Sequence, residues 1–202
     1  MKLYYSPGAC SLASHIALEE TQLPYTTVKV ELGSKRTADG GDYLAINEKG
    51  YVPTLVLDNG GVLTENAIVL QYIADQNPGT DLAPAHGTFA RYRLGEWLNF
   101  IASEIHKGFG PLWNAMSSDE VKEAARRNLA KRFAYVEKRV ASTPYLMGDT
   151  FTIADAYLFV LMNWTDHLGV DLTPFPNLRD FRARIKTRPA VQKAMRDEGL
   201  SA

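Results

Sequence analysis

The first 75 residues alternate between the patterns of short strands and of helices. Runs of β-branched and aromatic residues indicate strands, and apolar residues spaced three and four apart indicate helices. The expected elements are a strand at 3–5, a helix at 11–20, a strand at 25–32, a short helix at 42–46, strands at 54–57 and 62–64, and a helix at 65–75. The order βαβ followed by ββα predicts a small α/β domain with a mixed, four-stranded sheet.

The pattern changes after Asn77-Pro78-Gly79-Thr80, and strand signals vanish. Long stretches of helical periodicity follow, at 89–109, 119–141, 152–168, 181–187 and 190–198. Pro189 separates the last two, because proline starts a helix well and continues one badly. We therefore expect an α/β domain at 1–78, a linker at 79–86 and an all-α domain at 87–202.

Composition narrows the class of protein. Hydrophobic residues make up 46% of the chain, which is ordinary for a globular protein with a real core. The net charge of −1 makes nucleic acids and anionic membranes poor partners. The chain opens without an apolar leader, and one cysteine cannot form an internal disulfide. These features predict a cytoplasmic protein.

Cys10 is the most informative single residue. It follows the turn Pro7-Gly8, where the first strand passes into the first helix. A thiol at a helix N-terminus faces unpaired backbone N–H groups and the positive end of the helix dipole, and both favour the reactive thiolate. The alternative is an inert, buried cysteine, which is the more frequent role of a lone thiol in a soluble protein.

Two motifs in the helical part carry further information. Thr152-Ile153-Ala154-Asp155 has the spacing of a capping box, with Asp where Glu is usual. Asn99, Ser103 and His106 fall at i, i+4 and i+7, which predicts one polar helix face and a lined cleft. His106 alone would equally suit a surface or core histidine.

Seven segments along the chain carry a recognisable combination of motifs. In order, they are Tyr5-Ser6-Pro7-Gly8-Ala9-Cys10-Ser11-Leu12, Gly50-Tyr51-Val52-Pro53-Thr54-Leu55, Leu63-Thr64-Glu65-Asn66, Gln71-Tyr72-Ile73-Ala74-Asp75, Glu96-Trp97-Leu98-Asn99-Phe100-Ile101, Glu104-Ile105-His106-Lys107 and Phe151-Thr152-Ile153-Ala154-Asp155-Ala156-Tyr157. With these segments the chain resembles bacterial beta-class glutathione S-transferases along its whole length. The resemblance implies a thioredoxin-like domain followed by a helical domain. It also implies glutathione as substrate, a homodimer as the working form and no metal.

The resemblance also implies where glutathione binds. Val52, before a cis Pro53, would pair with its cysteinyl backbone, and Lys35 would meet the glycyl carboxylate. Asn66 would bind the γ-glutamyl carboxylate and Glu65 the amine. The family commonly has Ser or Gly at position 66, so Asn66 departs from the pattern while keeping a donor. A trans proline, a helix-stabilising glutamate and a solvated lysine are the alternatives that the residues alone leave open.

The chemistry implied by the resemblance centres on Cys10 and His106 beside the glutathione sulfur. Asn99 and His106 would approach the cysteine and the sulfur of glutathione, and Glu104 would reach the amine across the dimer interface. The remaining glutathione-site residues expected on this helix are Ser103 and Lys107. A pocket for a small hydrophobic electrophile is expected between the domains, with candidate residues Tyr5, Ser11, Phe109, Trp113, Trp164 and His167. Tyr5 and Ser11 are competing hydroxyl donors to the sulfur, and the resemblance to the beta class ranks His106 and Cys10 ahead of both.

The expected activity is conjugation of glutathione to hydrophobic electrophiles, with thiol–disulfide exchange or reductive dehalogenation through Cys10 as further routes. The main alternative is a protein that binds glutathione or hydrophobic compounds without turnover, because fold alone does not fix function. A monothiol redox protein remains open, since no Cys-x-x-Cys is present. A cysteine protease has no supporting motif. The family also has periplasmic members, so that compartment stays open.

Overall fold

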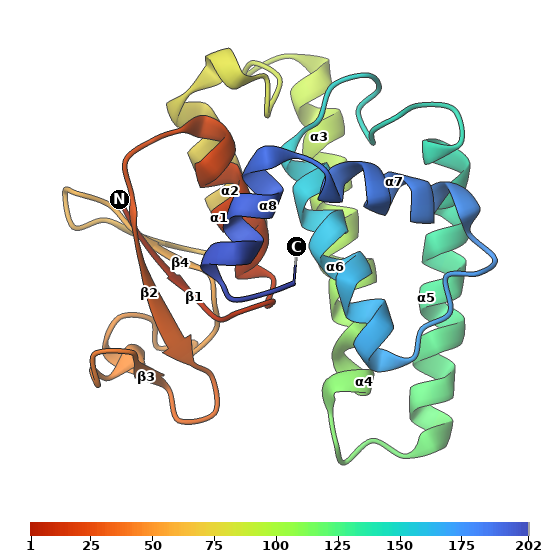
Figure 1. The fold of residues 1–202 in the computed structure, drawn as a ribbon, viewed down its shortest axis with the longest axis horizontal. Coiled ribbons are helices and arrows are strands. Elements are labelled where there is room, and N and C mark those ends of the chain that lie inside the picture. The colour runs from red at the N-terminus through yellow and green to blue at the C-terminus, as the bar shows by residue number, and fades with distance from the viewer. Residues whose placement is uncertain (202) are drawn as a thin grey trace. The chain divides into compact units, whose positions relative to one another are not determined.

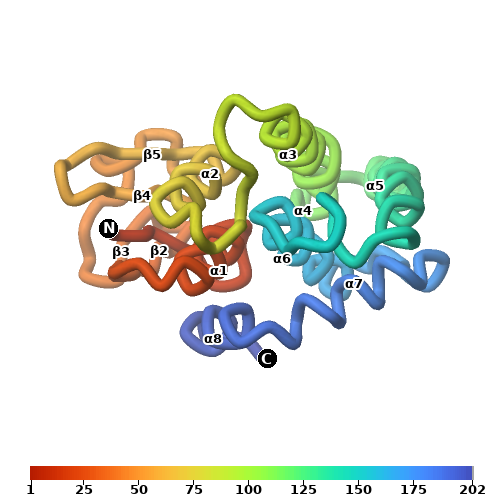
Figure 2. The backbone as a smooth tube through the Cα atoms, turned by 90° about the horizontal axis from the view of Figure 1, so that it is seen from above, coloured from red at the N-terminus to blue at the C-terminus, as the bar shows by residue number. Residues whose placement is uncertain are grey.

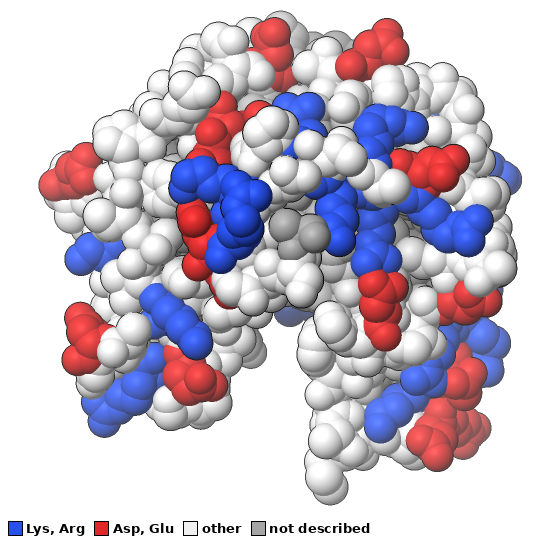
Figure 3. All heavy atoms as spheres, viewed as in Figure 1, with Lys and Arg blue, Asp and Glu red and all other residues white. Residues whose placement is uncertain are grey.

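The computed structural model describes residues 1–201. Contacts divide the described residues into two compact units, which are described separately: residues 1–83 with 186–201, and residues 84–185. Residues 186–201, which the sequence pattern grouped with the helical part, thus pack in the first unit. Lysines and arginines are interspersed with acidic residues on the face drawn in Figure 3, in keeping with the small net charge.

A five-stranded sheet forms the centre of the first unit, in the order β3-β2-β1-β4-β5 (Figure 1). The strands are β1 (Lys2–Tyr5), β2 (Thr26–Glu31), β3 (Arg36–Thr37), β4 (Thr54–Val56) and β5 (Val62–Thr64). β1 pairs in parallel with β2 and antiparallel with β4, so the sheet is mixed as predicted.

The prediction of four strands was wrong by one. β3 contributes only two residues, which pair antiparallel with Val30 and Glu31 of β2. A two-residue strand is too short to show the alternation on which strand prediction depends. The tight return is made by Lys35, whose φ of 57° lies in the left-handed region.

Both faces of this sheet are covered. Tyr4 packs with Tyr43, Val30 and Val52, so the 3₁₀ turn Tyr43–Ala45 closes one face. Leu3 lies opposite Leu55 in the register and points to the other face, where both side chains are fully buried. The helices of this unit are α1 (Ser11–Thr21), α2 (Asn66–Gln76) and α8 (Pro189–Asp197).

α1 is buried on nearly every side because it contacts both α2 and α8. Figure 2 shows α8 lying beside α1 although about 170 residues separate them in the chain. Val191, Ala194 and Met195 form the buried stripe of α8. The sequence predicted the helix α8 but not its partner, because an apolar stripe does not identify the surface that covers it.

The second unit is all-helical, as predicted. Its helices are α3 (Phe89–Phe100), α4 (Gly110–Trp113), α5 (Asp119–Val140), α6 (Ile153–Leu168) and α7 (Pro176–Lys186). α6 is apolar almost all round and forms the core of this unit, as an all-round apolar helix must. None of the helices in residues 1–201 is long and apolar enough to cross a membrane.

The single helix predicted at 89–109 changes its winding in the structure. A π-helical turn, Ile101–His106, follows α3, and a 3₁₀ turn, Lys107–Phe109, follows that. The apolar spacing through this stretch averages the α-helical period, so the pattern gave no sign of the extra residue. Short π-helical segments occur often at functional sites.

The predicted capping box is confirmed at the start of α6. The Thr152 side chain is paired with the backbone of Asp155, and the Asp155 side chain accepts from the Thr152 N–H at 2.8 Å. Asp155 also accepts from the Leu146 N–H at 2.7 Å, so it connects the preceding loop to the helix.

Candidate active site

Cys10 occupies the N-cap position of α1 and is 8% exposed. Its Sγ donates to the backbone carbonyl of Val52 at 3.2 Å. The peptide bond between Val52 and Pro53 is cis. The single thiol therefore lies against the loop that precedes β4, at the start of a helix whose first N–H groups favour negative charge.

The loop around Val52 is held from several sides. The Tyr43 hydroxyl and the Asn47 amide both donate to the Tyr51 carbonyl, at 2.7 and 2.8 Å. Lys35 donates from Nζ to the Gly50 carbonyl at 2.9 Å. The structure thus brings three predicted residues, Cys10, Val52 and Lys35, to one loop. Tyr43 and Asn47 were missed, because nothing in their local pattern indicates this long-range support.

Glu65 and Asn66 mark the start of α2. Glu65 is the N-cap residue with φ of 68° and ψ of 114°, an unusual conformation for a residue other than glycine. Its carboxylate is exposed and pairs with Lys49 Nζ at 2.6 Å. Lys49 was not predicted, because a lysine 16 residues before an acid leaves no recognisable pattern in the sequence.

The Asn66 side chain is buried, and among the described residues only one of its two polar atoms has a hydrogen-bond partner. Its Oδ1 accepts from the Ser14 hydroxyl of α1 at 2.7 Å. Its Nδ2 has no hydrogen-bond partner in the part of the chain that the structure describes. A buried donor without a partner is costly, and here it sits at a helix N-terminus, which suits an anion.

Ser11 and Tyr5 have different surroundings. Ser11 is fully buried, and its hydroxyl bonds the Ser6 backbone, accepting from N–H at 3.2 Å and donating to the carbonyl at 3.3 Å. The Tyr5 ring lies 5.9 Å from the His15 ring. Burial, followed by the carboxylates of Glu198 and Asp197, raises the pKa of Tyr5, so its hydroxyl stays protonated near neutral pH.

In the second unit, His106 belongs to an aromatic cluster. Its Nδ1 lies 2.6 Å from the Tyr157 hydroxyl, and its ring centroid lies 5.0 Å from that of Trp164. Phe109 and Trp113 pack edge-on against Trp164, at 5.5 and 5.6 Å. Phe109 is fully buried and Trp113 is 54% exposed, so the cluster runs from the core to the surface.

The other predicted residues of this unit lie at the surface. Asn99, Ser103, Lys107 and His167 are exposed. Ser103 donates to the Asn99 carbonyl at 2.9 Å, and Glu104 pairs with Arg132 of α5, Nη2 to Oε2, at 2.7 Å. Tyr157 was missed as the neighbour of His106, because 51 residues separate the two.

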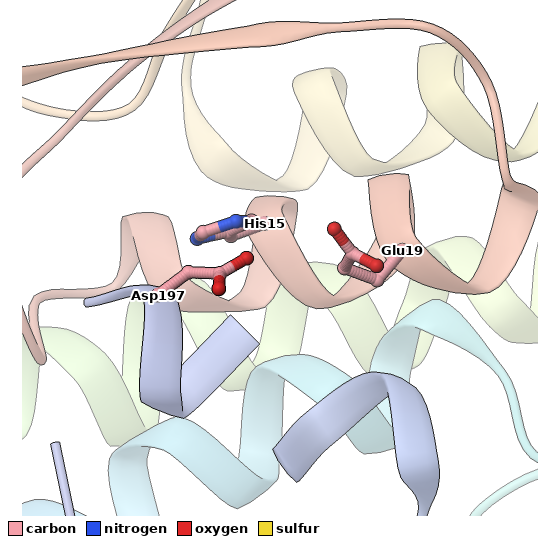
Figure 4. Close-up of side chains that lie close together, drawn as sticks. All are labelled: His15, Glu19 and Asp197. Atoms are coloured by element: carbon pink, nitrogen blue, oxygen red, sulfur yellow. The ribbon is translucent and has the colours of Figure 1, made fainter. Parts of the chain in front are cut away.

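One group of described residues has the composition of a metal site. His15 and Glu19 of α1 and Asp197 of α8 point toward one another (Figure 4), with ligand atoms within 4.8 Å. Lys193 Nζ already pairs with Glu19 at 3.0 Å and Asp197 at 2.6 Å, and these bonds raise the pKa of Lys193. The acidic charge is therefore balanced by a resident ammonium group.

These features define a class: a thioredoxin-like sheet with a thiol beside a cis-proline loop, in a chain that also carries a helical unit. Two family models match, the N-terminal domain of glutathione S-transferases at residues 8–76 and their C-terminal domain at residues 100–189. The chain belongs to the glutathione S-transferase family.

Three relatives are similar over full length. Glutathione S-transferase GstA of Escherichia coli O157:H7 is 44% identical, covering 99% of this chain and 100% of that protein. A sphingomonad glutathione S-transferase solved in complex with glutathione is 46% identical with a TM-score of 0.96. The bacterial beta-class enzyme of Sphingomonas chungbukensis is 46% identical with a TM-score of 0.97. Both structural alignments cover 100% of each chain.

Proposed function

We propose that this chain is a beta-class glutathione transferase that conjugates reduced glutathione to small hydrophobic electrophiles. The observation that carries the proposal is the contact between Cys10 Sγ and the Val52 carbonyl, at the cis Val52–Pro53 loop. A sulfur group and a strand-like backbone segment are thereby adjacent, which suits a short thiol-containing peptide bound as an added strand.

The residues around that loop match the charged ends of glutathione. Lys35 supplies a cation for the glycyl carboxylate beside Gly50. Asn66 Nδ2, which has no partner among residues 1–201, and the N-terminus of α2 supply donors for the γ-glutamyl carboxylate. The exposed carboxylate of Glu65 supplies an acceptor for the amine. Each polar end of the tripeptide therefore has a complementary group in the first unit.

In conjugation, glutathione gives up its thiol proton to solvent and its thiolate attacks the electrophile, whose leaving group departs with the bonding electrons. Donors beside the sulfur favour the thiolate. We assign that role to His106, with Asn99, Ser103 and Lys107 as further polar groups of the second unit. The aromatic cluster of Phe109, Trp113 and Trp164 suits an apolar co-substrate.

Cys10 also permits thiol–disulfide exchange. Its thiolate attacks one sulfur of a disulfide, a mixed disulfide forms, and the other sulfur leaves as a thiolate. Reductive dehalogenation is a further proposed route. We also propose a homodimer in which Glu104 contributes to the partner's site. We further propose that residues 1–78 bind glutathione, that residues 87–202 contribute the hydrophobic substrate site and the dimer interface, and that the protein is cytoplasmic.

Calorimetric titration with reduced glutathione tests the proposal directly. We expect saturable binding with one site per chain. Glu65→Ala is expected to weaken binding and raise the KM for glutathione roughly fivefold, because one charge-assisted hydrogen bond to the amine is lost. Glu48→Ala, an exposed acid in the adjacent loop, serves as the matched control. No heat from the wild type at two temperatures would favour a protein that sequesters hydrophobic compounds.

The substitution Cys10→Ala distinguishes conjugation from thiol–disulfide exchange. We expect loss of glutathione-dependent disulfide exchange, because no other cysteine exists in the chain, while conjugation retains at least about a tenth of its kcat. Mass spectrometry of the glutathione adduct follows the exchange, and absorbance follows conjugation. Exchange that survives the substitution would remove Cys10 from that reaction.

A further inference from the structure

Glu198 is a buried acid that no function considered so far uses. It follows the last helix, α8, and its side chain has no exposed surface. Oε1 lies 3.0 Å from Nδ1 of His15 in α1, and Oε2 accepts from the Gly8 N–H at 2.9 Å. One carboxylate from the end of the chain thus joins α1 to the turn that precedes Cys10.

The Gly8 N–H of that turn requires a hydrogen-bond acceptor outside the turn. Ala9 N–H donates to the Ser6 carbonyl at 3.0 Å, and Gly8 has φ of 70°, which are the marks of a type II turn with Pro7 at its second position. The N–H of the third residue points away from such a turn. Glu198 accepts it, and Leu200 lies 3.6 Å from where a Gly8 side chain would begin.

His15 holds the other oxygen of Glu198 in place. The Nε2 atom of its ring lies 3.0 Å from the Tyr25 hydroxyl, which in turn donates to Glu19. Both ring nitrogens therefore have partners, and the ring is 2% exposed. Burial raises the pKa of Glu198, while its bonds to His15 and Gly8 lower it in part. These bonds offset some of the cost of burying the acid.

We propose that Glu198 is a positioning residue for Cys10. Its carboxylate fixes the Ser6–Ala9 turn and so holds the Cys10 sulfur against the Val52 carbonyl. The inference rests on the role of Cys10 in the proposed function. Loosening the turn releases the thiol from this contact and exposes it to solvent.

The packing of α8 against α1 does not by itself explain why Glu198 is bonded to the turn before Cys10. Arg188 binds Glu20 through two hydrogen bonds, at 2.7 and 3.0 Å, and Lys193 binds Glu19. These ion pairs also fasten α8 to α1, but neither bonds the turn before Cys10. Lys193→Ala therefore weakens docking while leaving the link to Gly8 in place, which makes it the matched control.

The experiment uses the fact that Cys10 is the only thiol of the chain. Iodoacetamide alkylation of the full-length protein, followed by mass spectrometry from pH 6 to 9 and well below the unfolding temperature, reports on this residue alone. Glu198→Gln, which replaces one carboxylate oxygen with an NH₂ group and removes the negative charge, is expected to react about threefold faster than wild type, and Glu198→Ala about tenfold faster. Lys193→Ala is expected to match wild type.

Glu198→Gln decides the question if Glu198→Ala fails to fold. An unchanged or slower alkylation rate in Glu198→Gln, or an equal acceleration in Lys193→Ala, would overturn the proposal and leave Glu198 with helix docking alone. The assay contains no glutathione. A wild type that fails to bind or conjugate glutathione would therefore refute the proposed function without changing the result of the alkylation assay.

Discussion

Replacing His106 with alanine is expected to lower kcat for conjugation on the order of a hundredfold, while the KM for glutathione changes less than about threefold. A hundredfold loss corresponds to about 2.7 kcal/mol of transition-state stabilisation. The expected asymmetry follows from the proposed role, because a group that acts on the sulfur contributes most when the thiolate reacts. Steady-state kinetics at varied glutathione and fixed electrophile provide the measurement.

The surroundings of His106 sharpen this test. The Tyr157 hydroxyl fixes one ring nitrogen at 2.6 Å, and Trp164 packs against the ring. Tyr157→Phe keeps the aromatic packing and removes that hydrogen bond, so it is expected to lower kcat by a smaller factor, about tenfold. His86→Ala, at an exposed histidine in the linker, is the control. An unchanged kcat in His106→Ala would exclude a catalytic role.

The sequence was most informative where the chemistry is local. Cys10 could be located because a β-prone run, a Pro-Gly turn and a helical pattern follow one another within about ten residues. The capping box was readable for the same reason, since Thr152 and Asp155 lie three residues apart and precede an apolar helix. Short-range hydrogen bonding leaves a short-range pattern.

Hydrogen bonds to the site residues from distant parts of the chain left no such pattern in the sequence. Glu198 meets Gly8 across 190 residues, and Tyr157 meets His106 across 51. Neither residue differs in its local sequence from an ordinary helix or helix-end residue. The Nδ2 atom of Asn66, which has no hydrogen-bond partner among the described residues, could not be recognised either, because its burial depends on α1 packing against α2. Periodicity predicts which face is buried, but the tertiary fold decides what meets it.

The π-helical turn qualifies one expectation about the site. Asn99, Ser103 and His106 were placed on one face under α-helical geometry. The turn Ile101–His106 winds differently, and in the structure His106 is half-buried beside Tyr157 while Asn99 and Ser103 are exposed. Polar residues at α-helical spacing therefore need not share the same burial or the same neighbours when a π-helical turn lies among them.

Asp155→Ala is expected to lower the free energy of unfolding by about 3 kcal/mol. The carboxylate is fully buried and accepts from the N–H groups of Leu146 and Thr152 and from the Thr152 hydroxyl. Alanine removes all three acceptor contacts and leaves the donors buried at the start of the core helix α6. Urea unfolding followed by fluorescence and by circular dichroism provides the measurement.

The matched control for this substitution is Asp149→Ala, which removes an exposed acid from the same loop. It is expected to change the free energy of unfolding by less than about 0.5 kcal/mol. A loss for Asp155→Ala no larger than that of the control would show that the capping box contributes little to the stability of the second unit.

The cost of Asp155→Ala should also depend on pH. Burial raises the pKa of Asp155 from 3.8 to about 6, although its hydrogen bonds to Leu146 and Thr152 lower it in part. The folded state therefore binds a proton more tightly than the unfolded state, so this group contributes more stability as pH falls below 6 and loses that contribution as pH rises through 6. The alanine variant lacks this titration, and its deficit relative to wild type should grow by about 1 kcal/mol between pH 7 and pH 5. A deficit that shrinks over that range would mean that the hydrogen bonds to the carboxylate outweigh its desolvation.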